Sequence, residues 1–122
     1  MPRILVIDDD PDVRGSLTKI LMRAGYDVAA AADGAAGIEL QHEEPADVII
    51  TDIFMPGLDG LQTIRQLKKE GSAVRIIAVS GGDRTGTMDL KEHAHLMGAF
   101  TVLAKPFEMG DVLAAVKAAL DA

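Results

Sequence analysis

The chain has 122 residues, a formal net charge of −7 and no cysteine. This length fits one compact domain, and the absence of cysteine excludes disulfides, thiolate catalysis and thiolate-bound metals. The acidic charge, with no basic cluster beyond the pair Lys68-Lys69, argues against nucleic acid as a direct ligand. Because no apolar run could span a bilayer and no signal-peptide pattern is present, we expect a cytoplasmic protein without membrane contact.

Short aliphatic runs alternate with amphipathic stretches along the whole chain. In chain order the pattern predicts a strand at 3–7, a helix from Pro11 to about Gly25, an edge strand at 26–30, a helix from an Asp33 cap to before Pro45, a strand at 47–51, a helix around 61–67 ended by Gly71, a strand at 74–79, a helix at about 88–97, a strand at 100–103 and a last helix around 112–120. This alternation indicates an α/β fold with a parallel sheet and helices on both faces. We expect one domain over residues 1–122 and no output domain.

Ionisable and hydroxyl side chains stand where the predicted strands end. They are Asp8, Asp9 and Asp10 after the first strand, Asp52 after the third, Ser80 after the fourth and Lys105 after the fifth. Because the carboxyl ends of parallel strands open on one edge of the sheet, we expect these residues to converge there. Asp10 precedes Pro11, which is typical of a helix N-cap and first helical position.

The predicted convergence has a chemical consequence. Several adjacent carboxylates repel one another unless a cation compensates them, and an oxygen-only ligand set suits Mg²⁺. A metal beside Asp52 would keep its carboxylate ionised and nucleophilic towards phosphorus, while Ser80 and Lys105 could bind the oxygens of an acyl phosphate. Taken alone, Asp52 could instead only cap the turn that follows it.

As a set, these residues resemble the receiver domains of two-component response regulators. The motifs that carry the resemblance are Ile7-Asp8-Asp9, Thr51-Asp52 with Met55-Pro56-Gly57 and Asp59-Gly60, the hydroxyl of Ser80, and Lys105-Pro106-Phe107. The resemblance covers essentially the whole chain. It implies a flavodoxin-like, doubly wound (βα)5 fold with a five-stranded parallel sheet in the order 2-1-3-4-5.

The resemblance also implies a function. Asp52 would accept a phosphoryl group from the phosphohistidine of a sensor histidine kinase or histidine phosphotransfer protein. Asp9 and Asp52 would bind Mg²⁺ directly, together with the Phe54 carbonyl, while Asp8 would act through water. Ser80 and Lys105 would contact the phosphoryl oxygens, and the Lys105–Pro106 bond would be cis. The chain would be a signalling phosphoacceptor rather than an enzyme, acting on a downstream protein by direct contacts or by phosphorelay.

Two positions depart from the pattern of the family. Val102 stands where the family usually has an aromatic switch residue, and we expect Phe100 to share its face of the sheet. We therefore hypothesise that Ser80 and the glycine-rich loop at 81–87 carry more of the response. Phe54 borders the acceptor, so we predict that Phe54→Asn would change the lifetime of the acyl phosphate.

Three other functions fit parts of the pattern. A receiver-like fold could serve as a phosphorylation-independent protein-binding module. An aspartyl-nucleophile phosphatase resembling the haloacid dehalogenases is disfavoured, because those enzymes carry a second acid at the position of Phe54. A flavodoxin-like cofactor binder is disfavoured because Asp8-Asp9-Asp10 would repel the cofactor's phosphate.

Overall fold

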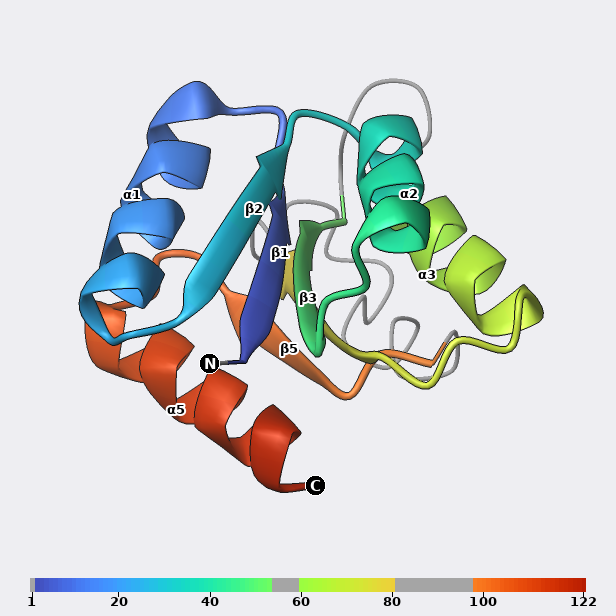
Figure 1. Cartoon of the computed structure of the whole chain (residues 1–122). Helices are drawn as coiled ribbons and strands as arrows, with labels where there is room; N and C mark the ends of the chain where they lie inside the picture. Colours follow the sequence, from blue (N-terminus) through green and yellow to red (C-terminus); the bar gives the residue numbers. More distant parts are fainter. Residues whose placement is uncertain (1, 54–59, 81–97) are drawn as a thin grey trace, which may run out of the picture.

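The centre of the fold is a five-stranded parallel sheet in the order β2-β1-β3-β4-β5 (Figure 1). The computed structural model describes residues 2–53, 60–80 and 98–122. The strands are β1 (Arg3–Ile7), β2 (Asp27–Ala31), β3 (Val48–Asp52), β4 (Arg75–Ser80) and β5 (Thr101–Ala104). The predicted strand order and the edge position of β2 are confirmed. The helix expected at 88–97 and the loop at 81–87 lie outside the described residues.

Helices cover both faces of the sheet, as the alternating pattern predicts. They are α1 (Pro11–Arg23), α2 (Gly34–Glu43), α3 (Gly60–Lys69) and α5 (Met109–Asp121). Figure 1 shows α1 and α5 on one side of the sheet and α2 and α3 on the other. None of the helices in the described segments is both long and apolar enough to cross a membrane.

The central strands are buried on both faces because alternate side chains join two separate cores. On β1, Ile4 and Val6 pack with Leu17 of α1 and with other residues of α1 and α5. Leu5 and Ile7 point the other way and pack in the core that α2 and α3 cover. This arrangement explains why the strands read as continuous aliphatic runs rather than as alternating apolar and polar residues.

Side-chain caps begin the helices that follow the first two strands. The Asp10 carboxylate accepts a hydrogen bond from the Asp12 amide at 2.9 Å, and α1 then starts at Pro11. The Asp33 carboxylate accepts one from the Ala36 amide at 2.8 Å at the start of α2. Both caps agree with the sequence prediction.

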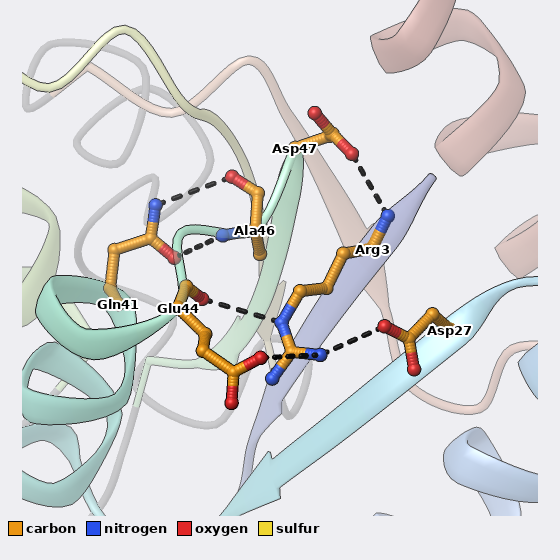
Figure 2. A network of polar contacts seen from close by, with 6 residues as sticks. All are labelled: Arg3, Asp27, Gln41, Glu44, Ala46 and Asp47. Carbon is orange, nitrogen blue, oxygen red and sulfur yellow. Dashed lines mark hydrogen bonds and ion pairs between the residues drawn. The ribbon is translucent and has the colours of Figure 1, made fainter. Parts of the chain in front are cut away.

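A polar network ties the strands together at the amino-terminal edge of the sheet (Figure 2). The Arg3 guanidinium lies 2.9 Å from the Asp27 carboxylate and donates to the Glu44 carbonyl at 3.3 Å. The Arg3 amide donates to the Asp47 carboxylate at 2.9 Å. The Gln41 side chain donates to the Ala46 carbonyl and accepts a hydrogen bond from the Ala46 amide. The network joins the starts of β1, β2 and β3, at the edge opposite the predicted site.

One expectation about β5 is wrong. Val102 packs in the core beneath α2 and α3, whereas Phe100 packs in the core beneath α1 and α5. The alternation of side chains does not extend to Phe100, because the strand begins only at Thr101 and Gly98 adopts a φ of 112° just before it. The Phe100 ring instead lies under the Arg75 guanidinium, 5.9 Å from the ring centroid.

Candidate functional site

The predicted site residues lie at the carboxyl ends of neighbouring strands. Asp8 directly follows β1, Asp52 ends β3, Ser80 ends β4 and Lys105 directly follows β5. The parallel register brings these ends level, because Asp52 pairs with Val79 and the next residue, Ser80, pairs with Ala104 of β5. The Lys105 amide also donates to the Ser80 carbonyl at 2.8 Å, which extends the pairing beyond β5.

Three carboxylates form the centre of this site. One oxygen each of Asp8, Asp9 and Asp52 lies within 4.8 Å of the others. Asp8 and Asp52 are buried, with 1% and 6% of their surface exposed, whereas Asp9 is open to solvent. The Lys105 ammonium lies 3.3 Å from Oδ2 of Asp52 and supplies one positive charge against the three negative ones.

Asp8 is the most deeply buried of the three acids. Its Oδ1 accepts a hydrogen bond from the Asp10 amide at 2.9 Å, but its buried Oδ2 has no hydrogen-bond partner among the described residues. Burial raises the pKa of Asp8, and the charges of Asp52 and Asp9 add to this effect. The Asp10 hydrogen bond and the Lys105 charge act in the opposite direction but do not cancel it.

This donor set fits a divalent cation. A buried carboxylate oxygen without a partner is costly, and so are adjacent like charges, unless a cation sits between them. The donors are all carboxylate oxygens, the ligand type that Mg²⁺ prefers, and the exposed Asp9 leaves the centre accessible from water. The Phe54 carbonyl, expected as a further ligand, lies outside the described residues.

The start of α3 packs directly against the backbone of the predicted acceptor. The Gly60 amide donates to the Ile53 carbonyl at 3.0 Å. A Cβ on Gly60 would collide with the carbonyl oxygen of Asp52 and lie 2.6 Å from the Ile53 Cα. Glycine is therefore required at position 60 for steric reasons, which gives a structural basis for the glycine of the predicted motif.

Sequence reasoning did not single out Arg14, although it reaches the site. Its guanidinium donates to the main-chain carbonyl of Asp8 at 2.8 Å. The signal was present in the spacing, since Arg14 stands four residues after the cap Asp10 and hence on the first turn of α1, beside the end of β1. Among the other expectations, the cis peptide bond between Lys105 and Pro106 is confirmed.

Comparison with known proteins points to one family. The sequence profile of the response regulator receiver domain matches residues 4–117. Protein PilH of Pseudomonas aeruginosa is 38% identical over 122 residues, an alignment that covers 98% of each chain. The transcriptional regulatory protein PrrA of Mycobacterium tuberculosis is 37% identical over 119 residues, which cover 98% of this chain but 50% of PrrA. The chain therefore spans about half the length of several curated relatives that it matches.

Solved structures show the same fold. The receiver domain of a Francisella response regulator superposes with a TM-score of 0.90 at 28% identity, covering 99% of this chain and 98% of that one. The chemotaxis protein CheY4 of Vibrio cholerae superposes with a TM-score of 0.88 at 27% identity, covering 98% and 99% of the two chains. The similarity thus extends over the whole sheet and its helices.

Proposed function

We propose that Asp52 accepts a phosphoryl group from a phosphohistidine and thereby switches a protein-binding surface. The premise is that this chain belongs to the family of response regulator receiver domains. The donor is a sensor histidine kinase or a histidine phosphotransfer protein. The observation that carries the proposal is the setting of Asp52. Its carboxylate is buried at the end of β3, near two other carboxylates and 3.3 Å from the Lys105 ammonium.

In the proposed transfer, a carboxylate oxygen of Asp52 forms a bond to phosphorus while the bond from phosphorus to the histidine nitrogen breaks. The leaving nitrogen keeps the electron pair, so no oxidant or further reactant is needed. Lys105 is placed to balance the charge that the phosphoryl oxygens bring to this buried position. Ser80, at the end of the adjacent strand, offers a hydroxyl donor to the same oxygens.

Asp9 and Asp52 would hold Mg²⁺ directly, with the Phe54 carbonyl, and Asp8 would act through a bound water. When bound, the ion supplies a Lewis acid for the phosphoryl oxygens. The Asp10 amide bonds Oδ1 of Asp8, and Oδ2 of Asp8 is buried without a hydrogen-bond partner among the described residues. The protein groups thus orient the ligands before the phosphoryl donor arrives.

The output is proposed to pass through β4 and β5. Phosphorylation adds negative charge and acceptor oxygens at Asp52, which attract Ser80 and Lys105 and bias a surface between two states. The Lys105 amide donates a hydrogen bond to the Ser80 carbonyl at 2.8 Å, so a movement of one residue affects the other. Val102 stands at the position of the family's aromatic switch residue, and because its side chain is short and stiff, more of the response falls to Ser80 and the loop that follows it. The downstream target is a protein.

The test is intact mass spectrometry after incubation with acetyl phosphate and Mg²⁺. Wild type should gain a single phosphoryl group in Mg²⁺ and none in excess chelator. Asp52→Asn should gain none. Asp33→Asn is the matched control, since it makes the same chemical change at the cap of α2 and should be phosphorylated like wild type. An adduct that survives in Asp52→Asn would refute the assignment, and no adduct on wild type would favour a phosphorylation-independent binding module.

A further inference from the structure

The main chain of Asp8 is held on both sides just beyond the end of β1. Its amide donates to the Ala31 carbonyl at the end of β2, at 3.1 Å. Its carbonyl receives the Arg14 guanidinium at 2.8 Å. Asp8 is 1% exposed, so a carbonyl that has left the sheet ladder needs a donor from the protein, and the first turn of α1 provides it.

Asp9 is placed by its neighbours rather than by bonds of its own. Within the described segments no hydrogen bond holds its side chain, and the residue is exposed. Before Asp9 in the chain, Arg14 and Ala31 hold the main chain of Asp8. After it, the Asp10 amide bonds the Asp8 carboxylate, and the Asp10 carboxylate caps α1. The orientation of the peptide between Asp8 and Asp9 therefore decides where the Asp9 carboxylate lies.

We propose that Arg14 is a positioning residue of the metal site: by bonding the Asp8 carbonyl it fixes the peptide between Asp8 and Asp9 and thereby places the Asp9 carboxylate beside those of Asp8 and Asp52. The proposal rests on the metal site proposed above. Groups that orient metal ligands from outside the ligand set typically contribute tenfold to a hundredfold in affinity. Arg14 suits the role because its planar guanidinium loses little freedom for each bond it makes.

The experiment compares Mg²⁺ affinity in Arg14→Met and Arg23→Met, measured by titrating MgCl2 and following the amide signals of Asp9 and Asp52 by NMR. Arg14→Met keeps a long side chain but removes the donor. Arg23→Met removes the same charge from the last turn of the same helix, where the residue is exposed. Both titrations are run at low salt and again in about 0.5 M NaCl, which screens long-range charge effects.

We expect Arg14→Met to bind Mg²⁺ about tenfold more weakly than wild type at both salt concentrations, and Arg23→Met to bind as wild type does. Before metal is added, the Asp9 amide signal should move in Arg14→Met and stay in place in Arg23→Met. Arg14→Lys, which keeps one donor on a flexible stem, should recover part of the affinity. Circular dichroism establishes that each variant is folded, and Arg14→Gln, too short to reach the carbonyl, replaces Arg14→Met if that variant is not.

Two outcomes would overturn the inference while leaving the metal site intact. One is an unchanged Mg²⁺ affinity in Arg14→Met. The other is an equal loss in both variants that disappears in NaCl, because this would show a general charge effect. If wild type itself binds no Mg²⁺, the proposed metal site fails, and the role of Arg14 fails with it.

Discussion

Replacing Asp8 by Asn should stabilise the metal-free protein. The side chain is 1% exposed, and its Oδ2 has no hydrogen-bond partner among the described residues. The substitution removes a negative charge but keeps an oxygen that can accept the hydrogen bond from Asp10. At the 4.8 Å that bounds the separations in this cluster, two unit charges repel by about 0.9 kcal/mol in water and about 3.5 kcal/mol at an effective dielectric constant near 20.

The expected gain lies between these limits. The repulsion between Asp8 and the buried Asp52 contributes fully, whereas the repulsion between Asp8 and the exposed Asp9 is screened by solvent. We therefore expect Asp8→Asn to raise the free energy of unfolding by about 1–3 kcal/mol at pH 7. The assay is urea unfolding followed by circular dichroism, with chelator present. Asp10→Asn is the control, because it makes the same change at an exposed cap where Asn serves about as well, and it should alter stability by less than about 0.5 kcal/mol.

The pH dependence of the gain follows from the raised pKa of Asp8. The folded protein holds this proton more tightly than the unfolded chain does, so ionisation costs stability as the pH rises from the unfolded value, near 3.8, through the folded pKa. The advantage of Asn should thus be complete once the pH exceeds the raised pKa of the folded protein, and it should vanish as the pH falls towards 3.8. Saturating Mg²⁺ should stabilise wild type by about 2.7 kcal/mol at a hundred times its Kd, and Asp8→Asn by less. A variant less stable than wild type at pH 7 in chelator would refute the reasoning.

Two further predictions concern packing and a surface ion pair. Gly60→Ala should lower the free energy of unfolding by about 3 kcal/mol or more, because the new Cβ meets the backbone of Asp52. Gly15→Ala is the control, because its Cβ meets nothing within 4 Å, and it should not destabilise the protein in the same urea assay. The pKa of Glu70 is lowered, chiefly by its 2.8 Å hydrogen bond to His42, and NMR titration of the Glu70 carboxyl should show it return towards 4.5 in His42→Ala. The stability from this pair is present above pH 4.5 and is lost as the pH falls through the lowered pKa of Glu70. A Glu70 titration that is unchanged in His42→Ala would contradict the assignment of the lowered pKa to His42.

Local sequence patterns were sufficient to predict a parallel sheet with helices on both faces, whereas the strand order came from the resemblance to receiver domains. The aliphatic run that becomes β1 and the Asp10-Pro11 pair that begins α1 act over a few residues, so they can be read without knowing the fold. Once strands and helices alternate, the handedness and burial of parallel sheets leave few topologies open. The position of an ionisable residue at a strand end is also local, which is why Asp8, Asp52 and Lys105 were placed at the same edge of the sheet.

Sequence patterns failed where alternation broke down. Phe100 was assigned to the face of Val102 on the period of a strand, but it precedes the strand and follows a glycine with positive φ. Its side chain therefore joins the opposite core. A period of two residues holds only while the backbone stays extended, and the chain bends at Phe100.

Other features arise only from contacts between distant segments. The sequence alone determined which residues gather at the carboxyl edge of the sheet, because strand ends and loops are encoded by neighbouring residues. The tertiary structure decided that Asp8 is buried with one oxygen unsatisfied, that Arg14 reaches back to its carbonyl, and that Gly60 abuts the backbone of Asp52. These features depend on how closely α1 and α3 approach strand ends, and that distance is set by packing across both cores rather than by any local pattern.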